Sequence, residues 1–253
     1  MSRLRINNIS KKFGAIQALS GVTFDVQPGE VLGLMGDNGA GKSTLVKIIA
    51  GNFRPTSGEL LIDDKPVVFN RPLDAQNQGV EVVYQDLALC NHLTAASNVF
   101  LGREKMRSVG PIRWLDYAGM NRHAAELFKQ LKSETRSRDL VRRMSGGQRQ
   151  AVAIARTLLS EPKIVLMDEP TAAISVRQVA EVLDLIRRLR DRGISVILIS
   201  HRMPDVFGVA DRIAVLRRGQ LVASKTTATS SPEEVTGLIT GAIDTALSEE
   251  TPA

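Results

Sequence analysis

The sequence Gly36-Asp37-Asn38-Gly39-Ala40-Gly41-Lys42-Ser43-Thr44 decides the fold of this chain. It follows the apolar run at 31–35 and leads into an apolar helical pattern at 45–50. A strand, then a glycine-rich loop, then a helix is the context that a phosphate-binding loop requires. The sequence therefore predicts a nucleotide site at residues 36–44.

Each part of this loop has a physical role in holding phosphate. The glycines let the backbone curl so that its N–H groups point inward at a di- or triphosphate. The helix that begins near Lys42 adds the positive end of its dipole. Lys42 supplies a charge for the β- and γ-phosphates, and the Ser43 hydroxyl can ligate Mg²⁺.

The composition bounds the class of protein. The 253 residues are 43% hydrophobic and 24% charged, as in a soluble globular chain with one large core, or with a core and a smaller lobe. No apolar run approaches the roughly 18 residues of a membrane span, and the N-terminus has no apolar signal region, so we expect a cytoplasmic protein. Cys90 is the only cysteine, which excludes an internal disulfide and a cysteine metal cluster. The net charge of +6 fits nucleic acid, an acidic membrane surface or a polyphosphate, and does not decide among them.

Strand and helix patterns alternate along the chain, which predicts a mostly parallel sheet covered on both faces. Residues 3–9 and 22–26 have strand patterns ahead of the glycine loop. From Asp86 to Leu159 the pattern is helical, with Gly110-Pro111 as a connection, and indicates a helical lobe inserted into an α/β core.

Two acidic residues, Asp168 and Glu169, follow the hydrophobic strand predicted at 164–167. Open α/β sheets place their ligand sites at the carboxyl ends of strands. Asp168 would hold Mg²⁺ directly or through water, and Glu169 would polarise the water that attacks the γ-phosphate. The alternative is a pair of surface residues that start a loop.

Ser145-Gly146-Gly147-Gln148 indicates a second phosphate binder, at the start of a second helix. Ser145 is well placed as the N-cap of that helix. Taken alone, the same residues fit a capped helix with flexible glycines. The combination with the glycine loop, the acidic pair and His201 favours the phosphate binder.

In combination, these motifs resemble the ATP-binding subunits of ABC transporters over nearly the whole chain. The matches are Gly36–Thr44 with Walker A, Gln85 with the Q-loop, Met144–Gln148 with the signature motif, Ile164–Asp168 with Walker B, Glu169 with the catalytic glutamate and His201 with the switch histidine. Phe13 stands where the family stacks an aromatic ring on adenine, although a plain core role fits the sequence equally well.

The resemblance implies an α/β fold: a P-loop NTPase (RecA-like) core with an N-terminal antiparallel β subdomain and an inserted α-helical subdomain. It implies one ATPase domain at 1–240, with its core at 1–85 and 160–230 and the helical subdomain at 86–159. The polar tail at 241–253 is expected to fray.

The resemblance also implies ATP and Mg²⁺ as cofactors, and roles for named residues. Glu169, His201 and Gln85 would be catalytic, and Ser43, Gln85 and Asp168 would bind the metal. The nucleotide-binding residues would be Phe13, Gly36, Asp37, Asn38, Gly39, Ala40, Gly41, Lys42, Ser43, Thr44, Ser145, Gly146, Gly147 and Gln148. The implied assembly is a head-to-tail homodimer, in which each γ-phosphate lies between Lys42 of one chain and the Ser145–Gly147 loop of the other.

Softer matches are similar to the ribose/xylose/fructose class of importers. They are 83–89, 98–104, 168–173 and 199–203. This class implies a permease, an extracytoplasmic sugar-binding protein that acts indirectly, and a place on the cytoplasmic face of the membrane. An ABC exporter, or an importer of another solute, shares the core motifs and stays an alternative.

Three departures from the family pattern stand out. Met144 replaces the usual leucine of the signature, Ser175 stands where many relatives carry an aspartate, and there is one cassette where this sugar class commonly fuses two. Nucleic acid is not expected as a partner, because the long coiled coils or the second cassette of such relatives are missing. The Asn-Lys-x-Asp stretch of GTPases is missing as well.

Overall fold

The computed structural model describes residues 1–109, 112–172 and 174–243. The predicted Gly110-Pro111 connection, one residue of the 168–173 match and most of the predicted tail lie outside these residues.

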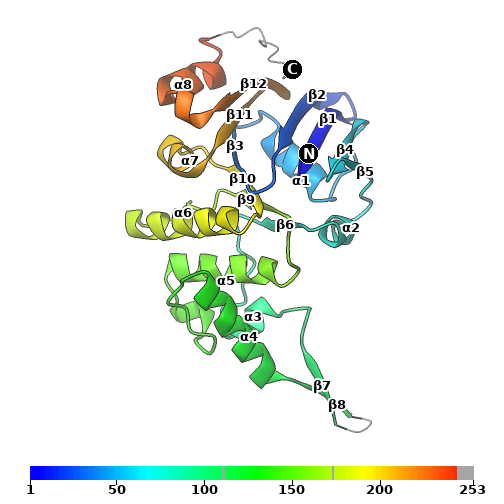
Figure 1. Cartoon of the computed structure of the whole chain (residues 1–253). Coiled ribbons are helices and arrows are strands. Elements are labelled where there is room, and N and C mark those ends of the chain that lie inside the picture. Colours follow the sequence, from blue (N-terminus) through cyan, green and yellow to red (C-terminus); the bar gives the residue numbers. More distant parts are fainter. Residues whose placement is uncertain (110–111, 173, 244–253) are drawn as a thin grey trace.

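A six-stranded sheet forms the centre of the molecule, in the order β12-β11-β3-β10-β9-β6 (Figure 1). Its strands are β3 (Val31–Met35), β6 (Val80–Val83), β9 (Ile164–Asp168), β10 (Ser195–Ile199), β11 (Arg212–Arg217) and β12 (Gln220–Thr226). Neighbouring strands are parallel except for β12, which returns from β11 as an antiparallel hairpin. The predicted mostly parallel sheet is confirmed.

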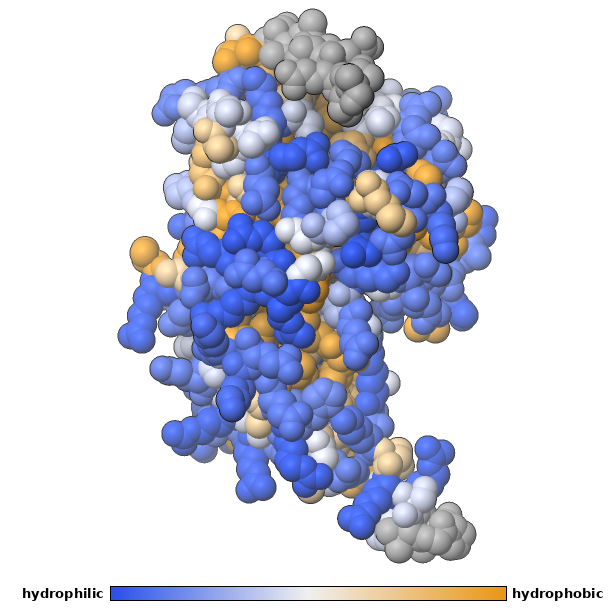
Figure 2. All heavy atoms as spheres, in the orientation of Figure 1, coloured by the Kyte–Doolittle hydropathy of each residue, from blue (hydrophilic) through white to orange (hydrophobic). Residues whose placement is uncertain are grey.

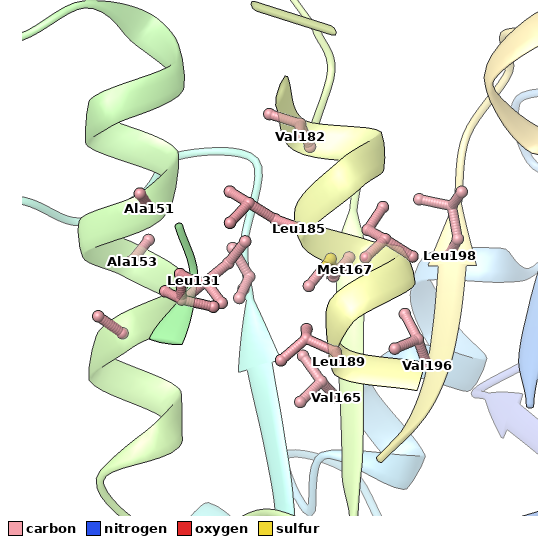
Figure 3. Packing of buried hydrophobic residues seen from close by; sticks show 14 of the residues in the cluster. Leu131, Ala151, Ala153, Val165, Met167, Val182, Leu185, Leu189, Val196 and Leu198 are labelled. Carbon is pink, nitrogen blue, oxygen red and sulfur yellow. The ribbon is translucent and has the colours of Figure 1, made fainter. Parts of the chain in front are cut away.

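The central strands are hydrophobic along their whole length because both faces of the sheet are covered. Successive side chains of a strand point to opposite faces, so each strand contributes to two cores. One core joins the sheet to the helices α5 (Gly146–Leu158), α6 (Val176–Asp191) and α7 (Met203–Val209), and Figure 3 shows part of it; its residues from β3, β9 and β10 are Val31, Met35, Val165, Met167, Val196 and Leu198. The other joins the sheet to α1 (Lys42–Ile49) and to a second sheet; its residues from β3, β9 and β10 are Leu32, Leu34, Ile164, Leu166, Ile197 and Ile199.

The second sheet is antiparallel, in the order β2-β1-β4-β5. It consists of β1 (Leu4–Phe13), β2 (Ile16–Val26), β4 (Ser57–Ile62) and β5 (Lys65–Val67). The expected N-terminal antiparallel β subdomain is therefore present, and it packs against α1.

The region between β6 and β9 is mainly helical and lies on the far side of α6 from the antiparallel sheet (Figure 1). It contains α3 (Ala95–Val99), α4 (Tyr117–Gln130), the short 3₁₀ helix η1 (Val141–Arg143) and α5. The structure adds a β-hairpin, β7 (Met106–Val109) with β8 (Ile112–Leu115), which projects from this lobe. Sequence analysis predicts no strands there, because four residues per strand carry too little pattern.

The remaining elements are α2 (Pro72–Asn77), η2 (Thr227–Thr229) and α8 (Pro232–Thr240). On the face drawn in Figure 2 hydrophilic residues dominate, and hydrophobic ones show mainly in a strip near the middle of the molecule. Among the described helices, none is both long enough and apolar enough to cross a membrane.

Candidate nucleotide site

Three loops meet at the carboxyl edge of the central sheet. Strand β10 pairs in parallel with β3 on one side and with β9 on the other. The glycine loop follows β3, Asp168 and Glu169 stand at the end of β9, and His201 follows β10. The strand order therefore brings together three motifs that are far apart in sequence.

These loops enclose a cavity of about 400 Å³. Its lining residues are Ile16, Gln17, Ala18, Asp37, Asn38, Gly39, Gly41, Lys42, Ser43, Thr44, Gln85, Asp168, Glu169, Ile199 and His201. A second hollow beside it shares Gln85, Glu169 and His201 and adds Gly36. All the predicted catalytic and metal-binding residues thus line one site.

The backbone of the glycine loop requires glycine at two positions above all. Gly36 has φ +150°, and a Cβ there would lie 2.2 Å from the carbonyl oxygen of Leu216 at the end of β11. Gly41 is the N-cap of α1 with φ +104°, and a Cβ there would lie 2.7 Å from the Leu19 side chain. The loop therefore curls tightly between β11 and β2, with α1 starting directly behind it.

The Lys42 ammonium lies under this loop. Its Nζ donates to the carbonyl oxygens of Gly36 at 2.5 Å and Asp37 at 2.9 Å. Burial lowers the pKa of Lys42, while the negative charges of Glu169, Asp37 and Asp168 act in the opposite direction. A polyphosphate in the cavity would stabilise this partly desolvated cation.

Asp168 is partly buried at the end of β9. Burial raises the pKa of its carboxyl, and the neighbouring charge of Glu169 adds to the shift, against Lys42 and Lys47. The ionised form of this group therefore gains from an added cation.

Glu169 and His201 form the closest contact between the loops. Glu169 Oε1 accepts a hydrogen bond from the His201 backbone N–H at 3.1 Å and lies 2.9 Å from His201 Nδ1. The other carboxylate oxygen, Oε2, is buried and has no hydrogen-bond partner among the described residues. Nearly all buried acceptors in proteins have a hydrogen-bond partner, so this oxygen is unusual within the site.

The donor set fits Mg²⁺ only together with a polyphosphate. No group of three or more His, Cys, Asp or Glu side chains with metal-site geometry occurs within the described part of the chain. Mg²⁺ is usually held by one or two carboxylates, with substrate phosphates and water completing its shell. Ser43, Gln85 and Asp168, which line the same cavity, meet that requirement.

The signature residues lie at a separate place. Ser145, Gly147 and Gln148 line a hollow of about 450 Å³ between the starts of α5 and α6, and none of its described lining residues comes from the glycine loop at 36–44. Ser145 Oγ accepts from the Gln148 N–H at 3.2 Å, and Gln148 Oε1 accepts from the Ser145 N–H at 3.0 Å. Ser145 is thus the N-cap that the sequence predicts, in a reciprocal capping box. One chain does not bring its two glycine loops together.

Phe13 is not among the residues that line the nucleotide cavity. It is 42% exposed and meets Phe53 edge to face, with ring centroids 5.4 Å apart, so it is no core residue. Its predicted stacking on adenine stays a prediction. The structure instead places Ile16, its partner across the β1–β2 turn, in the cavity wall, 70% exposed. Only pairing of the two strands could have pointed to Ile16, since no motif includes it.

The comparisons with known proteins agree with this geometry. The family model described as ABC transporter matches residues 19–172. A xylose/arabinose import ATP-binding protein of Sulfolobus acidocaldarius is 43% identical over 94% of this chain and 93% of its own length. A fructose import ATP-binding protein of Rhizobium meliloti is 44% identical over 86% of this chain and 85% of its own length. A ribose import ATP-binding protein of Yersinia pestis is 42% identical over 94% of this chain, which spans 46% of that relative.

Solved structures show the same fold. A nucleotide-free ATP-binding cassette from an ABC transporter superposes with a TM-score of 0.80 at 27% identity, over 95% of this chain and 96% of that one. A bacterial ABC transporter cassette described as dimeric superposes with a TM-score of 0.71 at 28% identity, over 88% and 98%. With the motifs gathered at one sheet edge, the family model matched and relatives above 40% identity along most of its length, this chain belongs to the ABC transporter family and has the fold of its ATP-binding cassette.

Proposed function

We propose that this chain is the ATP-hydrolysing subunit of a monosaccharide importer. ATP hydrolysis is supported most by the position of Glu169, which lines the cavity of the glycine loop. Its buried Oε2 has no hydrogen-bond partner among the described residues. Monosaccharide import is supported by the names of the relatives, which are xylose/arabinose, ribose and fructose import ATP-binding proteins. These relatives do not favour an exporter.

Binding would use the backbone N–H groups of 36–44 and the Lys42 ammonium, which exchanges the carbonyl oxygens of Gly36 and Asp37 for phosphate oxygens. Ser43, Gln85 and Asp168 would hold Mg²⁺, which supplies positive charge to the β- and γ-phosphate oxygens when bound.

Hydrolysis would use Glu169 as the general base. The Glu169 carboxylate would accept a proton from the attacking water, while the contacts of Oε1 with the His201 N–H and imidazole orient it. His201, whose side chain is 70% exposed and which lines the cavity, would then also reach the γ-phosphate.

The functional unit would be a head-to-tail homodimer. The signature loop has an anion-binding helix start but no acid or base of the nucleotide cavity around it. Each loop would therefore complete the site of a partner copy, so that ATP bridges two chains and its hydrolysis lets them part.

The inserted lobe would transmit this change. Gln85 follows β6 at the junction of the proposed core (1–85 and 160–230) with the proposed helical subdomain (86–159), and its side chain faces the cavity. A shift of Gln85 with nucleotide state would move the lobe against a permease, with the chain on the cytoplasmic face of the membrane. A sugar-binding protein on the other side would act only through that permease.

The test is ATP turnover by the purified chain, alone and reconstituted with its permease and sugar-binding protein in lipid vesicles. We expect Mg²⁺-dependent hydrolysis that a pentose or hexose stimulates. Hydrolysis that responds to no sugar but to another solute would overturn sugar import and keep the ATPase. No hydrolysis in either preparation would overturn both.

A further inference from the structure

A second bridge lies beneath the Glu169–His201 pair. The Thr171 hydroxyl donates to Asp205 Oδ2 at 2.5 Å, and both residues are buried, at 0% and 3% exposure. No motif discussed above includes Asp205. The hydrogen bond joins two buried polar side chains that are 34 positions apart in sequence, and its structural role follows from what each residue contacts.

The bridge joins the two loops that carry the proposed catalytic pair. Thr171 lies two residues after Glu169, and Asp205 lies four residues after His201. The two loops are thus tied twice, once at the cavity by Glu169 and His201 and once in the interior by Thr171 and Asp205.

Asp205 is itself held in place by packing. It belongs to the first turn of α7, and the next residue, Val206, is fully buried against β3. A Cβ on Gly33 of β3 would lie 2.4 Å from Val206 Cγ1, so α7 approaches the sheet as closely as a glycine permits. Asp205 is therefore a fixed anchor for the loop at 168–172.

The charge of Asp205 has a partner as well. Arg202 Nε lies 3.3 Å from Oδ2, the same oxygen that accepts from Thr171. Arg202 follows His201 directly, and its own N–H donates to the buried Ser200 hydroxyl at 3.1 Å. Asp205 thus contacts both the loop that carries Glu169, through Thr171, and the residue next to His201, which is Arg202.

Glu169 needs such support because its backbone is strained. Its φ is +50°, in the left-handed region that non-glycine residues seldom adopt. The Glu169 N–H donates to the Ile199 carbonyl at 2.9 Å, and its own carbonyl accepts from the Ala172 N–H at 3.1 Å. Thr171 lies inside that turn, so its side-chain bond helps to fix the turn that aims the carboxylate.

We propose that Thr171 and Asp205 are positioning residues that hold Glu169 and His201 in register for the attack of water on the γ-phosphate. The inference rests on the proposed ATPase function. Loss of the bridge frees the loop at 200–205 to shift against the loop at 168–172. A misplacement of about 1 Å in a catalytic group can cost on the order of 10²-fold in rate. Nucleotide binding, which depends on 36–44, is unaffected.

Thr171→Val removes the hydroxyl and keeps the shape of the side chain, and Thr171→Ser keeps the hydroxyl. We expect Thr171→Val to lower kcat by roughly 10- to 100-fold with KM for ATP within about twofold of wild type. Thr171→Ser should restore kcat to within a fewfold. Asp205→Asn, which keeps the volume and weakens the acceptor, should fall between them.

Thr157→Val is the matched control. Thr157 is 3% exposed, and its hydroxyl donates to the Ile154 carbonyl at 2.8 Å within α5, away from both loops. The Thr157→Val variant therefore loses a buried hydroxyl, as Thr171→Val does, and should keep the kcat of the wild type. Equal losses of kcat in the two valine variants, or wild-type kcat in Thr171→Val, would overturn the proposal, as would a rise in KM that accounts for the loss.

Hydrogen exchange of the His201 amide tests the same bridge without hydrolysis, because that N–H donates to Glu169. Exchange should accelerate about tenfold or more in Thr171→Val and stay unchanged in Thr157→Val. If the wild-type chain hydrolyses no ATP but exchange of the His201 amide still accelerates in Thr171→Val alone, the proposed function fails and the positioning bridge stands. Unchanged exchange in Thr171→Val would refute the bridge.

Discussion

Two loops of this chain combine glycines with the start of a helix, and their surroundings differ. The loop at 36–44, which includes Lys42, shares its cavity with Gln85, Asp168, Glu169 and His201. The loop at 145–148 shares its hollow with α6 as far as Arg188 and with residues 131–134, and it meets no part of the nucleotide cavity among the described residues. The first gathers the charged and hydroxyl groups that phosphate chemistry would use, whereas the second combines a helix start with side chains of both charges, among them Lys132, Arg177, Glu134 and Glu181.

The difference is explained by the sheet. Parallel strands deliver their following loops to one edge, so the loops after β3, β9 and β10 meet there without further design. The signature loop starts α5, a helix of the inserted region that lies beside α6 (Figure 1). In the proposed homodimer, a loop so placed would serve the nucleotide of a second copy of the chain.

The largest expected effect is on turnover, in the first region. Glu169→Gln removes the proposed base and should lower kcat by about 10²–10⁴-fold, while the affinity for ATP stays near that of wild type. Single-turnover hydrolysis, measured beside equilibrium binding of ATP, checks both quantities. Turnover at the wild-type rate would remove Glu169 from its role.

The next effect is on binding in the same region. Lys42→Ala removes charge-assisted hydrogen bonds to phosphate, each about 1.5–3 kcal/mol, and should weaken Mg-ATP binding by roughly 10- to 100-fold. Calorimetric titration measures it. Lys129→Ala on α4 removes the same charge from the helical lobe and should bind as wild type does. Equal affinities for the two variants would contradict the assigned role of Lys42.

A smaller effect separates the second region from the first. Ser145→Ala loses an N-cap, at about 1 kcal/mol of stability and roughly 2–4 °C in Tm. It should leave ATP binding by the single chain unchanged and raise about tenfold the ATP concentration needed for dimer formation.

Ser231→Ala is the control for that variant, because Ser231 caps α8 with the same bond, to the Glu234 N–H at 3.1 Å. It should lose a similar amount of stability and dimerise like wild type. If both variants dimerise alike, Ser145 acts only as a cap, and the two regions have no common ligand.

The smallest effect concerns pH and stability. Because burial raises the pKa of Asp168, the folded chain keeps this proton at pH values where the unfolded chain has lost it. The contribution of Asp168 to stability therefore falls as pH rises from its ordinary value through the raised one, and its ionised form is unfavourable at neutral pH. Solvent screening keeps the effect modest, since the carboxyl is only partly buried.

Asp168→Asn should accordingly raise the Tm of the nucleotide-free chain by roughly 1–3 °C at pH 7. The gain should vanish at about pH 2.5 to 3, below the ordinary pKa of 3.8, because Asp168 is then mostly protonated in both the folded and the unfolded chain. Thermal unfolding at the two pH values measures it, and an Asn variant less stable at pH 7 would show that the environment of Asp168 favours its charge.

Sequence reasoning reaches the elements of the site because they depend on local signals. The strands β3 and β9 are short apolar runs, the glycine loop has its own pattern, and the cap at Ser145 follows from a serine before a helical stripe.

The remaining features depend on contacts that no local pattern encodes. The Thr171–Asp205 bridge spans 34 positions, Ile16 enters the cavity only through strand pairing, and Gly33 is required because Val206 packs on it. The helix α7 has seven residues and the strands β7 and β8 have four each, too few for a periodic signal.

The most direct test of whether two chains share the nucleotide is the molecular mass of the Glu169→Gln variant in solution. Sedimentation or light scattering measures this mass with saturating Mg-ATP. With hydrolysis blocked, the account predicts a dimer of twice the monomer mass that returns to monomer when ATP is replaced by ADP. A variant that binds ATP and stays monomeric at every protein concentration would contradict it.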